Sequence, residues 1–505
     1  MFEPTPTSNR KRIAVIGAGP AGLVALKTLI ATREYQDKRW EVIAFEQRTD
    51  IGGIWLPDPS PGDQPQTPLY NSLTTNLPHP IMAFRDFPFP HSTPLYPKAS
   101  VVLQYLQDYV KGFHLHPYIR FSTYVTSIKP YSLGTTGVSW NIATKSYPPI
   151  SNEEVTWTNV NTIVIANGRH GCPFYPSNID NFDVWKGVGK VSHSMTYREP
   201  TSFRDKSVIV VGNGPSALDI SPELVGIASR VYRSIRKSST TSGITTRGQP
   251  QDEEAITICR PIREFGDVKE GVVMLDDGKI LSGVDHVIFA TGYDISTPFL
   301  GPPVVNEIPN RERAYPMPDN WLINSGQHLF PLTKHMIPTP KHLPLGSFFV
   351  LGLPRPIVPF PFIEIQCHLV TAILSGKVEM DIEGENSAVH AMMEEMLRRF
   401  DNRSDLAARE WHRMDGERQF DYRVEIANLT DVDPNTMIPE WQRRVYARKL
   451  ELRKAWKEIE KKGEDKRVTK DVGKGGEHEW VELMDRILEE IDKGEQNRGW
   501  TKTTD

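Results

Sequence analysis

The stretch IAVIGAGPAGLVALKTL (residues 13–29) decides the fold of this chain. Its apolar, β-branched beginning predicts a buried parallel strand over 12–16, and the apolar run after the glycines predicts a helix. Gly17, Gly19 and Gly22 lie between the two in the spacing of a dinucleotide-binding turn. The first allows the tight turn, the second lets the backbone approach a pyrophosphate, and the third lets the helix pack against the strand. The helix N-terminus then directs unpaired N–H groups at the phosphates.

An acidic residue closes the next predicted strand. The run EVIAFE (41–46) ends on Glu46, 24 residues after Gly22. A carboxylate at this place can accept hydrogen bonds from both hydroxyls of an adenosine ribose. Glycine-rich turns also occur for packing alone, but strand, turn, helix, second strand and acid in this order indicate a dinucleotide site.

The pattern occurs a second time, in SVIVVGNGPSALDISPEL (207–224). Gly212, Gly214 and Ala217 repeat the turn with alanine in the third place, and Ser216 stands at the start of the following helix. We therefore expect these four residues to contact a second nucleotide.

The strand that follows this second turn ends without an acid. Ser234, Arg236 and Lys237 stand there instead, with Arg236 19 residues after Ala217. A guanidinium suits a 2′-phosphate, which a carboxylate would repel; a solvated surface charge is the alternative for Arg236. One site with an acid and one with an arginine predict an FAD site served by an NADPH site, because the nicotinamide can reduce the flavin.

Two further apolar runs, TIVIANG (162–168) and HVIFATG (286–292), also predict buried parallel strands. Strands that alternate with helices imply an α/β fold, here with two Rossmann-like dinucleotide-binding domains and C-terminal helices. The predicted division is an FAD-binding domain over 9–172 and 291–380, an inserted NADP-binding domain over 173–290, and a charged helical region over 381–505 packed on the FAD domain.

The composition excludes several classes of protein. With 505 residues and a net charge of −4, the chain has no basic excess for nucleic acid or for an acidic membrane. Its three cysteines, Cys172, Cys259 and Cys367, are too far apart for a disulfide scaffold or a zinc knuckle, and the histidines form no metal-binding frame. No apolar run reaches about 18 residues and the N-terminus lacks a secretory signal, so a cytosolic location without a membrane is expected.

The chain contains 41 prolines, which concentrate in two blocks, 57–97 and 331–361. Both blocks also carry many aromatic and apolar residues, which disordered tracts lack. The sequence therefore predicts ordered loops stiffened by proline.

The last 65 residues, 441–505, carry 17 basic and 15 acidic side chains. A coiled coil would need sustained heptads and a membrane-surface helix a one-sided basic excess, and neither pattern is present. Apolar residues instead recur at helical spacing, which predicts two surface helices docked by one face. These residues are Trp441, Val445, Leu452, Trp456 and Ile459, then Trp480, Met484, Ile487, Leu488 and Ile491.

From about residue 12 to 377 the sequence resembles the flavin-containing monooxygenases, most closely their soluble fungal branch. Motifs in the first half are the GGIW loop (52–55) with Gly53 and Trp55, and the block TNLPHPIMAFRDFPFP (75–90) with Asn76. Later motifs are the strand ends ANG (166–168) and ATG (290–292) with Thr291 and Gly292, then HSMTYR (193–198), GL (352–353) and PFPFIEIQ (359–366) with Gln366.

One motif departs from the family pattern FxGxxxHxxxY. Gly189, His193 and Tyr197 fit it, but the aromatic position falls on Gly187, and Trp185 lies two residues early. Either a short insertion restores the contact or the segment packs differently. We expect His193 and Tyr197 to pack and hydrogen-bond within the linker. Related Baeyer–Villiger monooxygenases have tryptophan at the last position, so Tyr197 favours oxygenation of a heteroatom.

The resemblance implies a mechanism. NADPH reduces FAD, O₂ adds to the flavin as a C4a-hydroperoxide, and a small-molecule nucleophile, an amine or a thioether, is oxygenated on nitrogen or sulfur. Asn76 and Gln366 are the predicted catalytic residues, because an amide can both donate to and accept from groups beside the flavin. The alternatives are a loop-capping asparagine and a glutamine held in a helix hydrogen bond.

Rival functions remain open at this point. A Baeyer–Villiger or N-hydroxylating monooxygenase shares both nucleotide folds, and a nucleotide-binding scaffold or redox sensor could keep the fold without turnover. A disulfide reductase is excluded, since no paired cysteines could relay electrons. The sequence is compatible with a homo-oligomer but does not specify one.

Overall fold

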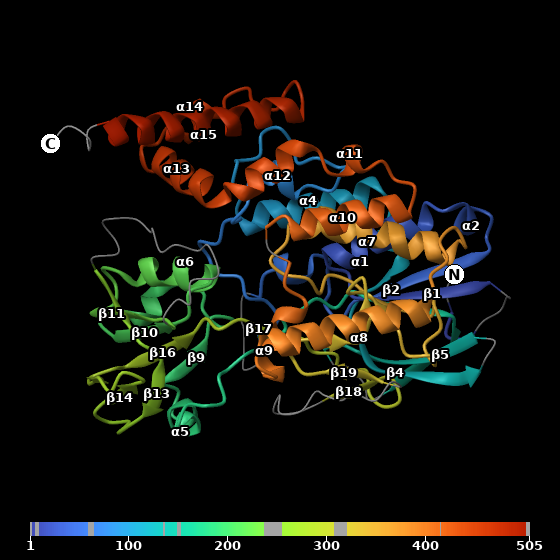
Figure 1. Ribbon diagram of the computed structural model, residues 1–505, viewed down its shortest axis with the longest axis horizontal. Coiled ribbons are helices and arrows are strands. Elements are labelled where there is room, and N and C mark those ends of the chain that lie inside the picture. Colours follow the sequence, from blue (N-terminus) through green and yellow to red (C-terminus); the bar gives the residue numbers. More distant parts are fainter. Residues whose placement is uncertain are drawn as a thin grey trace. The chain divides into compact units, whose positions relative to one another are not determined.

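The computed structural model describes residues 3–5, 10–58, 65–134, 137–148, 153–236, 255–307, 321–414 and 416–500 (Figure 1). The chain divides into two compact units. The first is drawn from residues 1–56, 74–169 and 295–505, and the second from 57–73 and 170–294. The sequence predicts the inserted domain as 173–290, whereas the second unit also includes 57–73 and extends to 294.

Segment 57–73 belongs to the second unit because its side chains pack there. Tyr70 is buried in the same core as Val208 and Ile220, and its hydroxyl donates to Asp219 at 2.7 Å. The carbonyl of Thr67 accepts from the guanidinium of Arg198 at 3.1 Å. The first proline-rich block is thus divided between the two units.

A five-stranded parallel sheet organises the first unit, in the order β23-β7-β1-β2-β3. Its strands are β23 (Phe348–Val350), β7 (Thr162–Ile165), β1 (Lys11–Ile16), β2 (Trp40–Phe45) and β3 (Ile119–Arg120). Parallel strands form in the predicted runs 12–16, 41–46 and 162–168, but β2 ends at Phe45 and β7 ends at Ile165, before the end of each predicted run. Because β1 pairs with β2 on one side and β7 on the other, the strand order reverses at β1, which is where such sheets bind ligands.

Successive residues of these strands face two different layers. Ile13 and Val15 pack in a core with helices α1 (Pro20–Ile30) and α7 (Pro359–Leu374). Ala14 and Ile16 face the antiparallel sheet of β4 (Thr123–Gly134), β5 (Gly137–Ser146) and β6 (Glu154–Val160). Burial on both faces explains why β1 reads as a continuous apolar run.

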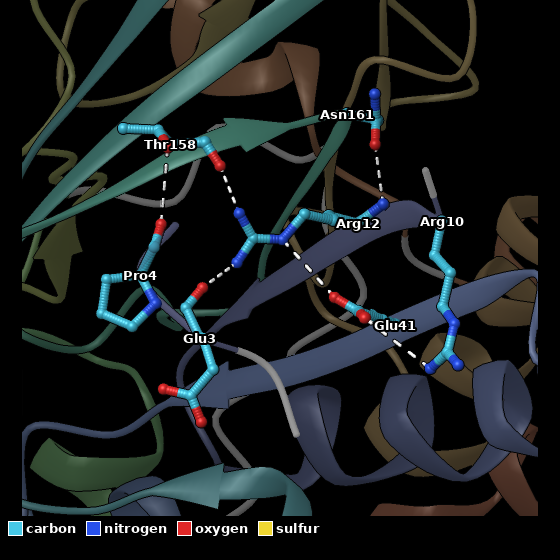
Figure 2. A network of polar contacts seen from close by, with 7 residues as sticks. All are labelled: Glu3, Pro4, Arg10, Arg12, Glu41, Thr158 and Asn161. Carbon is cyan, nitrogen blue, oxygen red and sulfur yellow. Dashed lines mark hydrogen bonds and ion pairs between the residues drawn. The ribbon is translucent and has the colours of Figure 1, made fainter. Parts of the chain in front are cut away.

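Arg12 ties this layer to the N-terminal segment (Figure 2). Its side chain is almost fully buried, and its two terminal nitrogens donate to the carbonyls of Thr158 and Glu3. Its Nε lies 3.6 Å from a carboxylate oxygen of Glu41, and its backbone N–H donates to Asn161 at 2.7 Å. A buried guanidinium is tolerated here because it has both carbonyl acceptors and a carboxylate.

The C-terminal region is helical and forms part of the first unit. Apolar residues of the predicted docking face, among them Val445, Trp456 and Trp480, are buried in the same core as α1 and α7, which confirms docking by one face. In place of the two helices predicted over 441–505, the described residues there form four, which are the last four of the list that follows. The helices of the C-terminal region are α8 (Ile382–Arg399), α9 (Ser404–Trp411), α10 (Arg418–Leu429), α11 (Pro434–Met437), α12 (Glu440–Ala447), α13 (Lys449–Lys461), α14 (Asp465–Val468) and α15 (Glu477–Trp500). Within the described residues, no helix has the length and apolar character needed to cross a bilayer.

The second unit repeats the parallel design, in the order β12-β11-β10-β16-β9. Its strands are β12 (Ile256–Cys259), β11 (Arg230–Ser234), β10 (Ser207–Val211), β16 (His286–Phe289) and β9 (Val191–His193), with helix α6 (Pro215–Leu224) after β10. Parallel strands form in the predicted runs 207–212 and 286–292, but β10 ends at Val211 and β16 at Phe289. Since β10 pairs with both β11 and β16, this sheet also reverses its strand order at the strand before the glycine turn.

The segment that departs from the family pattern FxGxxxHxxxY begins with a helix, α5 (Phe182–Gly187), which explains the departure. Trp185 is fully buried, stacks on Phe265 with ring centroids 4.8 Å apart, and donates to the carbonyl of Gly266 at 3.0 Å. Gly187 is the last residue of this helix, where no aromatic contact is required. The large side chain two residues early therefore anchors α5 in the core of the second unit.

Candidate functional site

The first glycine turn leaves no room for side chains. A Cβ atom on Gly22 would lie 1.9 Å from the carbonyl oxygen of Gly17, and one on Gly17 would lie 2.6 Å from the carbonyl oxygen of Ala166. Gly19 is the N-cap of α1, so the first N–H groups of that helix point out of the turn. The structure therefore has the close strand-helix contact that the glycine spacing predicts.

The GGIW loop lies directly against this turn. The N–H of Gly52 donates to the carbonyl of Ala18 at 3.1 Å, and a Cβ atom on Gly53, whose φ is +55°, would lie 2.9 Å from Cα of Gly19. Trp55 ends the short helix η1 (Gly53–Trp55) and is partly exposed. Two glycine-rich segments far apart in sequence thus form one backbone cradle at the carboxyl end of β1.

Arg48 holds the GGIW loop in place, a role that the sequence did not indicate. Its Nη1 donates to the carbonyls of Gly53 at 3.2 Å and Leu56 at 2.7 Å. Arg48 follows Glu46 by two residues. No local sequence pattern predicts its role, because its acceptors are backbone carbonyls.

The carboxylate of Glu46 is fixed between the first glycine turn and the segment that follows β2. It is 6% exposed and accepts from the N–H groups of Ala18 and Arg48, each at 2.8 Å. Burial raises the pKa of Glu46, and the two backbone donors act in the opposite direction. Each oxygen accepts one of these bonds and keeps a further lone pair, which is what ribose hydroxyls require.

Asn76 lies in a tightly held loop but is itself exposed. The N–H of Thr75 donates to Pro97 O at 2.9 Å, and the Thr75 hydroxyl donates to Leu77 O at 2.7 Å. The Asn76 amide makes no hydrogen bond to any described residue, so it does not cap the turn there. Its donors and acceptor are available to a ligand.

The structure uses Gln366 differently from the predicted ligand contact. It is fully buried on α7; its Oε1 accepts from the N–H of Gly352 at 3.0 Å and its Nε2 donates to Tyr422 at 3.2 Å. Tyr422, on α10, donates in turn to Lys334 O at 2.7 Å. The amide therefore supports the turn after β23 from within the protein. This use resembles the alternative role given for Gln366, a structural hydrogen bond, although the partners lie outside α7.

The second glycine turn resembles the first at its first two glycines but leaves room for an alanine at the third position. A Cβ atom on Gly212 would lie 2.5 Å from the carbonyl oxygen of Ala290, and Gly214 is the N-cap of α6. Ala217 is fully buried under the turn, whereas Ser216 is partly exposed at the helix start. These four residues lie together at the point where the strand order of this sheet reverses.

Thr291 and Gly292 follow β16 at the same edge. The Thr291 hydroxyl donates to the carbonyl of Phe174, and the N–H of Phe174 donates to Gly292 O at 2.9 Å. Both residues thus fix the segment around Phe174 to the end of the strand. Their hydrogen bonds are structural within the second unit.

The end of β11 separates the two predicted phosphate ligands. Ser234 is buried and its hydroxyl donates to Arg260 O at 3.0 Å, so its donor is already used. Arg236 is exposed two residues later, and Lys237 lies outside the described residues. Arg236 is the member of this group that the structure leaves open to solvent.

His193 and Tyr197 are packed within the second unit, as the sequence predicts. Nδ1 of His193 accepts from the N–H of Met195 at 3.1 Å, and burial lowers the pKa of His193 to about 4. The Tyr197 hydroxyl donates to Glu223 at 2.8 Å. Neither residue has the geometry of a general base and its partner.

Comparisons with known proteins agree with this geometry. The model of the flavin-binding monooxygenase-like family matches residues 10–261. "Flavin-containing monooxygenase FMO GS-OX-like 2" of Arabidopsis thaliana is 31% identical over 484 residues, which cover 90% of this chain and 93% of that protein. "Thiol-specific monooxygenase" of Saccharomyces cerevisiae is 30% identical, over 75% of this chain and 81% of that protein.

Among solved structures, S-allyl-L-cysteine S-oxygenase from Allium sativum superimposes with a TM-score of 0.71 at 27% identity. The match covers 88% of this chain and 93% of that one. Membership of a soluble fungal branch stays a prediction. Two glycine turns, each at the reversal point of a parallel sheet, and relatives that match almost end to end show that the chain belongs to the flavin-binding monooxygenase-like family and is a flavin-dependent monooxygenase.

Proposed function

We propose that the protein uses FAD and NADPH to transfer one oxygen atom from O₂ to the sulfur of a small molecule. For a thioether, the balanced reaction converts thioether, O₂, NADPH and a proton to sulfoxide, water and NADP⁺. The observation that carries the proposal is the presence of two glycine-turn sites with opposite chemistry in one chain. Buried Glu46 ends the second strand at one turn, and exposed Arg236 follows the second strand at the other.

The residues of the first turn fit FAD. The backbone of Gly19 and Gly53 forms a cradle that any Cβ atom would narrow, as a pyrophosphate requires. The carboxylate of Glu46, already fixed by two N–H groups, would accept the ribose hydroxyls. When bound, the flavin supplies the redox chemistry and the activation of O₂.

The second turn fits NADPH. Gly212, Gly214 and Ser216 would hold the pyrophosphate at the start of α6, and Arg236 would pair with the 2′-phosphate. Ser234 would add only an acceptor, because its hydroxyl proton is given to Arg260 O. Selectivity for NADPH over NADH is therefore assigned mainly to Arg236.

Asn76 is the proposed catalytic residue. Its amide is exposed on a loop whose backbone is fixed on both sides, so a donor is held in place without being used by the protein. Such a prearranged donor can stabilise charge that develops during oxygen transfer. Gln366 is proposed as a positioning residue, whose amide links the Gly352 turn to Tyr422 of α10.

Sulfur is the proposed acceptor atom. The thiol-specific monooxygenase and the S-allyl-L-cysteine S-oxygenase named above support it, and Tyr197 favours heteroatom oxygenation. Oxygenation of an amine nitrogen is the second candidate, and a Baeyer–Villiger reaction on a ketone is the third.

The test is a product panel with the purified flavoprotein. We expect a yellow protein that bleaches with NADPH much faster than with NADH and then forms sulfoxide from a thioether, with little H₂O₂. An amine and a ketone of similar size serve as comparison substrates. N-oxide or ester as the main product would replace the sulfur assignment, and a colourless protein without NADPH response would overturn the proposal.

The role of Asn76 is tested in the same assay with Asn76→Ala and Asn76→Ser. Flavin content and thermal stability should hold, because the exposed amide supports no part of the fold. Oxygenated product should fall and H₂O₂ should rise at unchanged NADPH consumption. Normal sulfoxide yield in both variants would remove Asn76 from the mechanism.

A further inference from the structure

Arg169 lies at the carboxyl edge of the first unit, on the side away from Glu46. It follows β7 by four residues, and its Nη1 donates to the carbonyl of Leu353, just after β23, at 2.8 Å. Strand β23 stands three places from β2, which Glu46 follows. At about 4.8 Å per strand, this is a distance on the order of 14 Å across the sheet. Arg169 therefore lies apart from the place predicted for the adenosine ribose.

One edge of the Arg169 guanidinium has no acceptor among the residues that the structure describes. Its Nε is buried and makes no hydrogen bond, and its Nη2 donates to no described residue. Arg403 and Arg444 show what this edge does elsewhere in the same protein. Each uses its Nε and Nη2 together to hold an aspartate, Asp405 at 3.3 and 2.9 Å and Asp485 at 3.0 and 2.6 Å. Arg169 presents the same pair of donors without a carboxylate.

Three other arginines whose buried Nε makes no hydrogen bond differ from Arg169 in this respect. Arg12, Arg198 and Arg423 all donate through both terminal nitrogens to acceptors within the protein. Their charge is thus met by carbonyl or amide oxygens on two sides. Arg169 has a single carbonyl acceptor, on its Nη1, and an open side-on edge.

The surroundings of Arg169 add positive charge rather than cancel it. Burial, and then the nearby charge of Arg355, lower the pKa of Arg169 to about 9. The pKa of His412 lies well below its usual value. The main cause is burial, followed by two neighbouring histidines and then by the charges of Arg169 and Arg355. No carboxylate of the described residues forms an ion pair with Arg169. A buried cation without a counter-charge is costly, and an anionic ligand would remove that cost.

We propose that the Nε–Nη2 edge of Arg169 binds a carboxylate group carried by the substrate. This inference rests on the proposed oxygenation of a sulfur compound. It specifies the substrate as a carboxylic acid that carries a thioether or a thiol. A carboxylate fits because its two coplanar oxygens match the two parallel N–H groups of that edge. The FAD pyrophosphate is disfavoured as the ligand, since its proposed cradle lies at Gly19, after β1, whereas Arg169 reaches from the end of β7 toward β23.

The test compares two substrates that differ in charge, 3-(methylthio)propanoate and its neutral amide. The measured quantity is the ratio of kcat/KM for the acid to kcat/KM for the amide. In Arg169→Gln we expect this ratio to fall about 10- to 100-fold, mainly through KM of the acid, because a charge-assisted bidentate contact is lost. Arg169→Lys should recover part of the ratio, because lysine supplies the positive charge but not the two parallel N–H groups of the guanidinium. Arg403→Gln, which breaks a surface pair of the same geometry, should leave the ratio unchanged.

Binding measured without turnover separates this inference from the proposed function. Calorimetric titration of the flavin-loaded protein with 3-(methylthio)propanoate should show binding in the wild type that weakens by the same factor in Arg169→Gln. Flavin content and KM for NADPH should not change; a selective fall in flavin content or rise in KM for NADPH would assign the edge to a cofactor phosphate and overturn the inference. An unchanged acid-to-amide ratio and unchanged calorimetric affinity would also overturn it. If the wild type binds the acid but oxidises neither substrate, the proposed function fails and the carboxylate subsite stands.

Discussion

Arg453 donates from its Nη2 to the hydroxyl of Thr74 at 2.6 Å, across 379 positions of sequence. Its guanidinium also lies over the ring of Tyr96, 4.3 Å from the centroid, and 3.7 Å from a carboxylate oxygen of Glu460. Thr74 stands two residues before Asn76. Helix α13 of the charged C-terminal region therefore braces the loop that carries the proposed catalytic amide.

Replacing this brace should lower coupling without removing the flavin. In Arg453→Met the Thr74 hydrogen bond is lost while most of the packing on Tyr96 is kept. A net hydrogen bond of about 1 kcal/mol corresponds to roughly a fivefold change in the population of the held loop. We expect sulfoxide yield per NADPH to fall several-fold and H₂O₂ to rise, with flavin content unchanged. Product and H₂O₂ are measured side by side.

The matched control is Arg448→Met on the adjacent turn. Arg448 forms ion pairs with Glu451 and Asp492, at 2.7 and 2.6 Å, and its guanidinium makes no hydrogen bond to a described residue of the Thr74 loop. Its loss should leave coupling at the wild-type value. Equal uncoupling in both variants would show that the helix packing in general, and not the Arg453 contact, controls the loop.

The contact between the two glycine segments gives a second prediction. Gly53→Ala adds a Cβ atom 2.9 Å from Cα of Gly19 at a φ of +55°, so the GGIW loop must move away from the first turn. We expect the variant to fold but to retain much less flavin, measured by absorbance after gel filtration. Gly376→Ala is the control, because its φ of +69° carries the same strain, about 1 kcal/mol, with no atom within 4 Å of the new Cβ. Similar flavin content in the two variants would contradict a cradle at Gly19 and Gly53.

The sequence predicts much of this arrangement because local patterns encode it. The five parallel strands that were predicted, both glycine turns and Glu46 follow from apolar runs and spacing that only one backbone geometry satisfies. The docked face of the C-terminal helices follows from periodicity in the same way. Such features depend on residues close together in the chain.

Contacts made across the fold could not be predicted in this way. Arg453 and Thr74, or Arg169 and Leu353, meet only after the sheet and helices are assembled, and their acceptors are a hydroxyl and a carbonyl that carry no sequence signal. Gln366 shows the converse: its motif marks the position, but only the structure shows that Gly352 and Tyr422 use its amide. Trp185 is similar, since its place two residues early makes sense only once α5 packs on Phe265.

Nucleotide preference should depend on Arg236. In Arg236→Gln the guanidinium that would pair with a 2′-phosphate is removed, and loss of a charge-assisted contact corresponds to about a 10- to 100-fold drop. We expect kcat/KM for NADPH to fall by that factor while the value for NADH changes little. Flavin reduction is followed by stopped-flow absorbance. Arg230→Gln, exposed at the opposite end of β11, is the control and should leave both values unchanged. An equal loss with NADPH and NADH would make Arg236 a structural residue.

Acid stability should depend on His79, a residue of the first proline-rich block that contacts Trp480 of α15. It is 2% exposed, and its ring centroid is 4.6 Å from that of Trp480; burial lowers the pKa of His79 to about 3. An unfolded histidine titrates near 6.5, so below that pH the unfolded chain takes up a proton that the folded protein does not. The free energy of unfolding therefore falls as pH decreases from about 6.5 toward 3, by up to about 1.4 kcal/mol per pH unit for this residue. His79→Phe removes this proton, and between pH 7.5 and 5.0 its unfolding free energy should drop about 2 kcal/mol less than that of the wild type. Urea unfolding at the two pH values, followed by tryptophan fluorescence, measures the difference.

His91→Phe, at an exposed position of the same block, should keep the wild-type pH dependence. If His79→Phe keeps it too, the ring must be able to take up a proton in the folded state, and the dry environment inferred around it is wrong.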